Sequence, residues 1–329
     1  MTALVTGANG FVGAAVCRAL LTEGHRVRAL VRPGSDRRNL DGLGVGCVEG
    51  DIRNPESLDP AMEGCRYAFH VAADYRLWVR RPQRMYETNV QGSLNVLDAA
   101  RRAGAHRLVY TSSVAALGLT HDGTPANEQT PAGLKDMIGH YKRSKFLAET
   151  AIAARARDTG FSVVTVNPST PIGPGDLKPT PTGRLILDAA AGRMPAYVDT
   201  GLNVVHVDDV ARGHLLALRR GTDGERYILG GTDLSLREIL ALVARRIGRP
   251  PPRLRLPGWS LWPIALASEA LAFCTGKVPR ATVATVRMAS KRMYFSSAKA
   301  QSELGYQARP AGEAIADAID WYRRCGYLP

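Results

Sequence analysis

Two side chains that could move a proton stand four residues apart, at Tyr141 and Lys145. On a helix this spacing puts both on the same face. A free phenol titrates near ~10, but a neighbouring ammonium favours the phenolate and lowers the phenol pKa toward the working range. Lys145 could also donate hydrogen bonds to the ribose of a nucleotide. Because exposed helix faces show the same spacing, the pair alone does not separate a catalytic helix from a solvated one.

A third hydroxyl strengthens the catalytic interpretation. Residues 107–111 have the pattern of a strand, and Thr111, Ser112 and Ser113 stand at its carboxyl end. Parallel sheets bind their ligands at this edge. A serine there could hold a substrate oxygen while Tyr141 transfers a proton and a nicotinamide transfers a hydride. Together these features predict redox chemistry rather than binding without turnover.

A phosphate-binding turn is indicated near the amino terminus, where Gly7, Gly10 and Gly13 follow the first strand pattern and open a helical one. Gly7 would permit the tight turn, Gly10 the close approach of a pyrophosphate and Gly13 close packing, while the helix N-terminus offers N–H groups. We expect Phe11 and Val12, inside the motif, to lie beside the dinucleotide. The alternative, a glycine-rich surface turn, is disfavoured by the position at the first strand-to-helix junction.

The residues after the second strand pattern indicate which dinucleotide binds. Arg32 follows that strand directly, and Arg37 and Arg38 stand close behind. Sheets that bind NAD usually carry Asp or Glu in the place of Arg32, to accept from the ribose hydroxyls. Arginines suit the doubly charged 2′-phosphate of NADP instead. We therefore expect NADP(H) rather than NAD, the alternative being three solvated surface arginines.

Two further strand ends are expected to line the cofactor. Asp51 and Ile52 follow the third strand pattern, where Asp51 could accept from the adenine amine. Val71, Ala72 and Ala73 end the fourth, where small side chains leave room for a dinucleotide. Ordinary strand-end packing would account for the same residues.

These residues require a sheet that presents its strand ends along one edge. The first half of the chain alternates short β-branched runs with helical patterns, which indicates parallel βαβ units. We predict a doubly wound parallel α/β sheet of the Rossmann type, with six strands at residues 3–6, 26–31, 46–49, 67–71, 107–111 and 162–166. Between them, apolar residues recur at helical spacing, as in 90–100.

The pattern changes after Asn167 to loops rich in Pro, Gly and Thr. We therefore divide the chain into an NADP-binding domain at residues 1–168 and a smaller substrate-binding region at 169–329, with a segment near 203–221 returning to the first domain. In the second region we expect helices at 236–247 and 312–323, and strands near 204–207 and 226–229.

Composition excludes several other classes of protein. The chain has 329 residues, 45% of them apolar and 22% charged, as in globular proteins. Its net charge of +13 comes mostly from scattered arginines without a nucleic-acid-binding motif, so we expect no nucleic-acid partner. Five widely spaced cysteines lack metal-ligand spacing, so we predict no metal site. A strand pattern directly after Met1 leaves no room for a signal peptide, which favours a cytoplasmic protein.

One apolar segment, residues 257–274, has two interpretations, and it is too short and interrupted to span a bilayer. It could be a mostly buried helix, started by Pro263 and packed against the sheet domain. Alternatively, Trp259 and Trp262 could contact a lipid-linked substrate or the inner face of a membrane, as a peripheral contact through residues 257–280. The flanking cations that would meet anionic head groups are Arg253, Arg255, Lys277 and Arg280.

Several of these motifs resemble a known family. The glycine turn, Thr111 to Ser113, the Tyr141 and Lys145 pair, residues 89–92 and Asn167-Pro168 are similar to extended short-chain dehydrogenase/reductases, in their dihydroflavonol 4-reductase-like branch. Residues 72–78, 137–145, 167–174 and 197–203 resemble bacterial hopanoid-associated sugar epimerases. The resemblance implies Ser113, Tyr141 and Lys145 as catalytic triad, Pro168 beside the nicotinamide, and a homodimer.

Three functions remain open at this point. The first is an NADPH-dependent carbonyl reductase, or the reverse alcohol dehydrogenase, acting on a sugar-like or hopanoid-linked small molecule. The second is a nucleotide-sugar epimerase or dehydratase that retains NAD(P) and usually carries an acidic residue in the place of Arg32. The third is a regulator that senses NADP without turnover and does not need Tyr141 and Lys145. The residues present favour the first.

Overall fold

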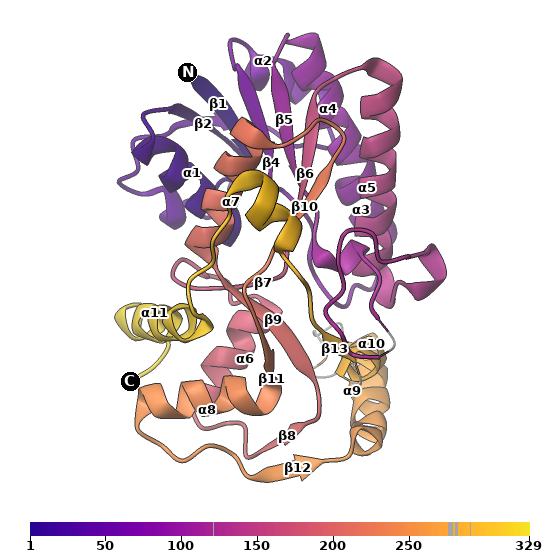
Figure 1. Ribbon diagram of the computed structural model, residues 1–329, viewed down its shortest axis with the longest axis vertical. Coiled ribbons are helices and arrows are strands. Elements are labelled where there is room, and N and C mark those ends of the chain that lie inside the picture. Colours follow the sequence, from indigo (N-terminus) through magenta and orange to yellow (C-terminus); the bar gives the residue numbers. More distant parts are fainter. Residues whose placement is uncertain (121, 276–278, 280–281, 290) are drawn as a thin grey trace.

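The computed structural model describes residues 1–120, 122–275, 279, 282–289 and 291–329, with residues 273 and 274 described by their backbone alone. A large parallel sheet with helices on both faces occupies the upper part of the molecule in Figure 1. Shorter strands and further helices form a smaller region below it. Chain segments far apart in sequence meet where the two regions join.

Seven parallel strands form the large sheet, in the order β10-β6-β5-β4-β1-β2-β3. The bounds are β1 Thr2–Thr6, β2 Arg26–Val31, β3 Gly46–Glu49, β4 Tyr67–His70, β5 Arg107–Thr111, β6 Val163–Pro168 and β10 Arg226–Leu229. The six predicted strands and the doubly wound α/β class are thereby confirmed. We had expected β10 in the smaller region, but it pairs with β6. Because Tyr227, Ile228 and Leu229 are fully buried, this strand needs cover on both faces, which the large sheet provides.

The strand order reverses beside β1, with β2 on one side and β4 on the other. In doubly wound sheets the crevice at this reversal, outside the carboxyl ends of the strands, is where ligands bind. The glycine turn follows β1, and residues 71–73 follow β4. The topology therefore brings these two predicted cofactor segments to opposite sides of one crevice.

Helices cover both faces of this sheet (Figure 1). On one face, α1 (Phe11–Thr22) packs with α7 (Val207–Arg220), and their buried residues share a core. On the other face lie α2 (Asp59–Met62), α4 (Gly92–Arg102) and α5 (Gly139–Thr159). Shorter elements connect them: α3 Gln83–Tyr86, the π-helix η3 Glu87–Gln91, and the 3-10 turns η1 Arg38–Leu40, η2 Pro55–Ser57, η4 Val114–Ala116 and η5 Leu134–Asp136.

The smaller region has two short sheets and its own core. One sheet contains β7 Thr170–Ile172, β9 Gly201–His206, β11 Thr232–Ser235 and β13 Arg292–Met293, and the other pairs β8 Ala196–Val198 with β12 Leu254–Leu256. The helices and turns are α6 Pro181–Ala190, α8 Leu236–Ile247, η6 Gly258–Leu261, α9 Trp262–Thr275, α10 Val283–Ala289 and α11 Ala311–Arg324. The π-helix η7 Ala300–Leu304 packs instead on the core of the large sheet, beside α7 and β10. The helices predicted at 236–247 and 312–323 are α8 and α11. None of the helices in the described ranges is long and apolar enough to cross a bilayer.

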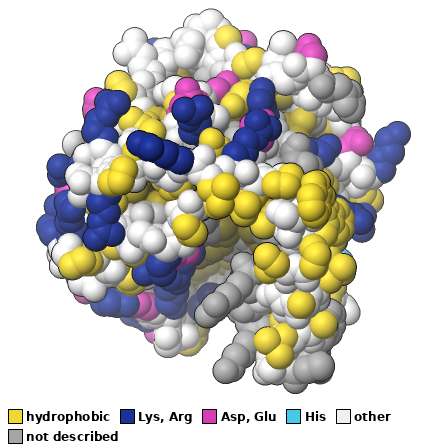
Figure 2. Space-filling model, turned by 90° about the horizontal axis from the view of Figure 1, so that it is seen from below, with side chains coloured by type: hydrophobic (Ala, Val, Ile, Leu, Met, Phe, Trp, Pro, Cys, Tyr) yellow, Lys and Arg dark blue, Asp and Glu magenta, His cyan; other side chains and the backbone are white. Residues whose placement is uncertain are grey.

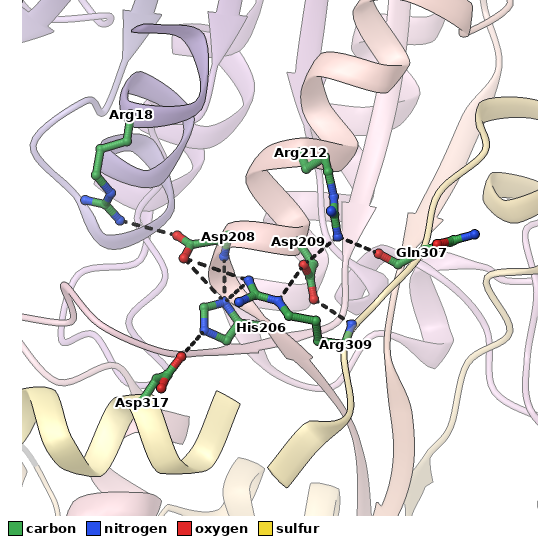
Figure 3. A network of polar contacts seen from close by, with 8 residues as sticks. All are labelled: Arg18, His206, Asp208, Asp209, Arg212, Gln307, Arg309 and Asp317. Carbon is green, nitrogen blue, oxygen red and sulfur yellow. Dashed lines mark hydrogen bonds and ion pairs between the residues drawn. The ribbon is translucent and has the colours of Figure 1, made fainter. Parts of the chain in front are cut away.

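A polar junction ties the two regions together (Figure 3). Asp209 at the start of α7 is 1% exposed, and its carboxylate accepts from Arg309 Nε at 3.0 Å and Arg212 Nη2 at 2.8 Å. His206 at the end of β9 lies 3.1 Å from Asp317 of α11 and 2.9 Å from Arg309. Buried charges of this kind need partners, and here those partners come from the C-terminal segment. The C-terminal segment is thereby fastened beneath the sheet edge that carries the cofactor turn.

Candidate active site

The glycine turn is closely packed against the end of β4. Gly7 has φ +66°, and a Cβ built on it would lie 2.7 Å from the backbone of Ala72. A Cβ on Gly13 would lie 2.1 Å from the carbonyl oxygen of Gly7. Gly10 caps α1, and Phe11 and Val12, partly buried in its first turn, pack on the core below. Any larger residue at position 7 or 13 would displace the turn. The turn thus forms a cradle of backbone atoms at the N-terminus of α1, where a ligand can come close to the main chain.

A buried polar network fixes the residues after β4. Thr6 Oγ1 accepts from Ala72 N–H at 3.2 Å and lies 2.7 Å from His70 Nδ1. His70 Nε2 lies 2.8 Å from Ser93 Oγ. Complete burial lowers the pKa of His70 to about 3, so the imidazole is neutral. Val71, Ala72 and Ala73 are left partly exposed on the crevice side, and our sequence analysis had not recognised the support from His70.

The arginines after β2 differ in their partners. Arg37 forms an ion pair with Glu49 at the end of β3, and Arg38 with Asp36. Arg32 is exposed directly after β2, and no ion pair or hydrogen bond of its guanidinium to the described residues is present. Arg32 therefore has the guanidinium most available to a ligand.

Asp51 and Ile52 are engaged by the protein itself. The Asp51 carboxylate accepts from Arg53 Nη2 at 2.5 Å and from Arg53 N–H at 2.9 Å, and these hydrogen bonds lower its pKa. Ile52 is 7% exposed and contacts the Gly92 position of α4. Ile52 is thus engaged in packing. The Asp51 carboxylate could also accept from an adenine.

Asn9 and Asn39, which our sequence analysis missed, join three loops around the glycine turn. Asn39 Nδ2 donates to Asn9 O at 3.2 Å and to Gly175 O at 2.9 Å. Asn9 Nδ2 donates to Asp36 O at 2.8 Å. The loop that follows β7 is thereby held close to Phe11, with the loop after β2 on the other side. No local spacing rule could have found these contacts, because Asn39 and Gly175 are far apart in sequence.

Tyr141 and Lys145 lie on the inner face of α5, beside the carboxyl end of β5. Lys145 is 2% exposed; its Nζ donates to Thr111 O at 2.8 Å and lies 5.0 Å from the Tyr110 ring centre. Burial lowers the pKa of Lys145 to about 8, although the Glu149 carboxylate acts in the opposite sense. The Ser113 hydroxyl accepts from Ala115 N–H at 3.1 Å, at the start of η4. The structure thus brings the three predicted catalytic residues to one strand end.

The expected lowering of the Tyr141 pKa by Lys145 is wrong for this state of the site. Burial raises the pKa of Tyr141, and an interaction with the Ser113 hydroxyl opposes this rise only partly. The physical reason is that the Lys145 ammonium is turned toward the Thr111 carbonyl. Tyr141 is therefore a neutral phenol at neutral pH, poised to donate a proton rather than to accept one.

Two networks outside the predicted site hold α5, the helix that carries Tyr141 and Lys145. Asn89 of η3 donates to Ser144 Oγ and to Asp74 O, each at 2.9 Å, which ties α5 to the loop after β4. Asn167 at the end of β6 donates to Ser113 O at 3.1 Å and to Glu149 at 2.8 Å, and Glu149 also accepts from Arg226 at 3.0 Å. The sequence signal for Glu149 was a carboxylate one helical turn after Lys145, on the face that α5 buries.

Buried polar atoms at the same strand ends are left without partners. Within the described residues, Asn167 Oδ1 and Ser169 Oγ have no hydrogen bond, although both are buried. They flank Pro168, which ends β6 and is buried. Buried polar groups in native proteins usually have hydrogen-bond partners, so these two atoms are positioned to bind a polar ligand. Together with the glycine cradle, they fit a dinucleotide laid along the carboxyl edge from β2 to β6.

Comparisons with known proteins agree with this geometry. A family model described as the NAD dependent epimerase/dehydratase family matches residues 3–230. The chain is 45% identical to a "Putative dihydroflavonol 4-reductase" of Synechocystis sp., over 98% of this chain and 95% of that protein. It is 36% identical to sterol demethylase protein B of Methylococcus capsulatus, over 100% of both chains. The crystal structure of gox2253 superposes with a TM-score of 0.90 at 52% identity, over 100% of this chain and 99% of that one.

Proposed function

The chain belongs to the NAD dependent epimerase/dehydratase family, an extended type of short-chain dehydrogenase/reductase, and from that premise we propose that it is an NADP(H)-dependent carbonyl reductase. The observation that carries the proposal is the buried Lys145 beside Tyr141, at the sheet edge that also holds the glycine turn. A lysine is almost never buried without a reason in chemistry or in pairing. A regulator that binds NADP without turnover would not require this pair.

We assign proton transfer to Tyr141 and the binding of the substrate oxygen to Ser113. A bound nicotinamide would supply the hydride to the carbonyl carbon of the substrate. The Tyr141 phenol, neutral because burial raises its pKa, donates its proton to the carbonyl oxygen, toward which the Ser113 hydroxyl donates a hydrogen bond. Lys145, with a pKa of about 8, can return a proton to Tyr141 from solvent and donate to a cofactor ribose. In the reverse direction Tyr141 acts as the base, and Ser113 holds the substrate oxygen by a hydrogen bond.

The choice of NADP(H) is supported by Arg32. Its exposed guanidinium stands where NAD-binding sheets usually carry a carboxylate, and it is not used in an ion pair with any described residue. Arg37 lies nearby but is already paired with Glu49. We assign the phosphates to the glycine turn and its helix, from Gly7 to Gly13, and the adenine edge to Asp51.

The substrate we propose is a ketone or secondary alcohol on a lipid-linked or sugar-like molecule. The full-length likeness to sterol demethylase protein B supports a polycyclic lipid. Peripheral contact with a membrane would bring such a substrate to the protein, and the 257–280 segment is the proposed site of contact. A nucleotide-sugar epimerase or dehydratase is the second candidate, which the family itself supports. The homodimer and the cytoplasmic location stay predictions, checked by sedimentation and by cell fractionation.

The dinucleotide that co-purifies with the protein separates the two candidates. The purified protein is denatured and the released nucleotide is identified by mass spectrometry. A reductase should release little nucleotide, or NADP that exchanges with added NADPH, because it must release the oxidised cofactor after each turnover. Stoichiometric NAD that survives dialysis would contradict the reductase and favour the epimerase, which returns its hydride within one cycle.

A further inference from the structure

The helix α9 exposes three of its large apolar side chains. Its inner face carries Ala265 and Ala272, which are 0% and 2% exposed. Ile264, Leu266 and Leu271 are 58%, 56% and 64% exposed. A helix that faces water has the opposite pattern, with large apolar residues inside. The expectation of a mostly buried helix is therefore wrong for the outer face of α9, although Pro263 does lie in the first turn, as predicted.

A pocket lies between η6, the first residue of α9, α10 and the residue that caps α5. Its volume is about 340 Å3, and its apolar walls are Trp259, Trp262, Val286 and Ile138. Trp259 is 74% exposed at the mouth. Ile138 caps α5 three residues before Tyr141, and Ala284 of α10 lies against Gly139. The pocket thus joins Trp259 and Trp262 to the N-terminal end of α5.

Cations lie at the same end of the molecule, and two carboxylates there are engaged. Arg253 and Lys291 are exposed, and Arg287 lies 5.9 Å from the Trp262 ring. The Asp199 carboxylate pairs with Arg255 and Arg292, and Glu269 accepts from Val283 N–H at 2.9 Å. Lys277 and Arg280, predicted to flank the segment, lie outside the described residues. Figure 2, which views this end of the molecule, shows apolar side chains gathered beside Lys and Arg.

We propose that η6, α9 and α10 form a lipid-docking face, which binds the surface of an anionic bilayer. Trp259, Ile264 and Leu271 would enter the interface, as tryptophan and aliphatic residues of interfacial helices do, while Arg253 and Lys291 meet the head groups. The charge is complementary to anionic lipid, and the inverted pattern of α9 supplies the apolar contact. The proposal of membrane binding depends only on these residues and not on the proposed function. A further step, entry of a lipid-linked substrate through the pocket toward Tyr141, rests on the proposed function.

Vesicle binding tests the proposal. The full-length protein should co-sediment at low salt with vesicles of phosphatidylcholine and phosphatidylglycerol, and much less with phosphatidylcholine alone. Brominated acyl chains should quench tryptophan fluorescence in the wild type, and Trp259→Phe should remove most of that quenching. The double change Ile264→Ser, Leu271→Ser should weaken binding by at least about tenfold, because each side chain no longer gains from transfer out of water.

Charge reversal provides the matched control. Arg253→Glu should weaken binding to the anionic vesicles several-fold, and the difference should shrink in high salt, since exposed charges are then screened. Arg101→Glu reverses an equally exposed arginine at the end of α4, in the large sheet's layer, and should bind as the wild type. Equal effects of the two changes would show that net charge rather than this face drives binding, and would overturn the proposal.

Two other outcomes would overturn it as well. The first is a wild type that does not bind the anionic vesicles at low salt and whose fluorescence brominated lipid leaves unchanged. The second is a protein whose dimer dissociates on Ile264→Ser, Leu271→Ser, because the face would then be an interface between copies. If the double variant also loses NADPH binding, it is misfolded. The vesicle binding of Arg253→Glu then decides whether this face docks on lipid. Tyr141→Phe should bind vesicles normally, so failure of the proposed chemistry and failure of docking are distinguishable.

Discussion

The helices α5 and α9 both place side chains against their usual preference for water, in opposite directions. α5 buries Ser144, Lys145 and Glu149, whereas α9 exposes Ile264, Leu266 and Leu271. Each arrangement costs free energy unless something compensates it. For α5 the compensating groups belong to the protein: the Thr111 carbonyl serves Lys145, and Asn167 and Arg226 serve Glu149.

For α9 the described residues provide no such cover, as the exposed fractions show. A buried polar group whose partners lie inside the fold indicates chemistry. Exposed apolar groups that no part of the fold covers indicate an interface. In Figure 1 the two helices also lie in different regions, α5 against the large sheet and α9 in the smaller region below it.

The largest effect is expected from Tyr141→Phe. The ring still packs on the inner face of α5 and only the hydroxyl is lost, so the proton donor disappears while the cofactor contacts remain. Turnover of a ketone that the wild type reduces should fall by about 10²-fold or more, and calorimetric titration of NADPH should give an unchanged Kd. Retention of more than about a tenth of wild-type kcat would remove Tyr141 from the mechanism.

Arg32→Asp should weaken NADPH binding by about 10²-fold, because it removes a charge-assisted partner and puts a like charge beside the 2′-phosphate. NADH, which lacks that phosphate, should bind within a few-fold of its wild-type affinity. Arg38→Asp is the matched control: Arg38 is exposed like Arg32 but is already paired with Asp36. Calorimetry of both cofactors with both variants is the measurement. Equal NADPH affinity for Arg32→Asp and wild type would make Arg32 a surface residue.

Features that depend on local rules could be predicted from the sequence. The glycine turn is required by backbone geometry at Gly7 and Gly13, and the strand patterns follow from apolar runs between helical segments. Tyr141 and Lys145 share a face because any α-helix gives that spacing. The availability of Arg32 could not be predicted, because only the register of β2 with β3 places Glu49 within reach of Arg37.

Features that depend on tertiary arrangement were beyond the sequence. The residues 226–229 were recognisable as a strand, but their place beside β6 depends on the topology of the sheet. Glu149, Asn167 and Arg226 come from three elements, and nothing in their spacing indicates that they meet. The orientation of α9 was equally hidden, because a segment that is apolar on both faces does not reveal which one turns inward.

Glu149→Gln should shift the alkaline limb of the activity profile to lower pH. Burial has already lowered the pKa of Lys145 to about 8, and Glu149 raises it. Removing the carboxylate favours the neutral amine, so the Lys145 ammonium is lost earlier as pH rises, by up to about one pH unit. Glutamine can still accept from Asn167, which preserves the geometry.

The readout is kcat/KM as a function of pH. A purely structural role for Glu149 would lower kcat/KM equally at every pH and leave the limb in place, and that result would contradict the assignment. Glu313→Gln, an exposed change on α11, is the control and should leave the profile as it is.

The smallest effect is expected from Leu271→Ala. Because Leu271 is 64% exposed, truncation removes few contacts, and the free energy of unfolding should change by less than about 0.5 kcal/mol without lipid. Leu97→Ala is the matched change: Leu97 is fully buried on α4 and shares a core with Ala148 and Ile152 of α5, so about 3–5 kcal/mol should be lost. Urea unfolding followed by circular dichroism measures both.

If anionic vesicles bind the native face, they should stabilise the wild type more than Leu271→Ala, because ligand binding to the folded state adds to its stability. A lipid-free loss for Leu271→Ala as large as that for Leu97→Ala would mean that α9 is already covered in solution, and the contrast with α5 would disappear.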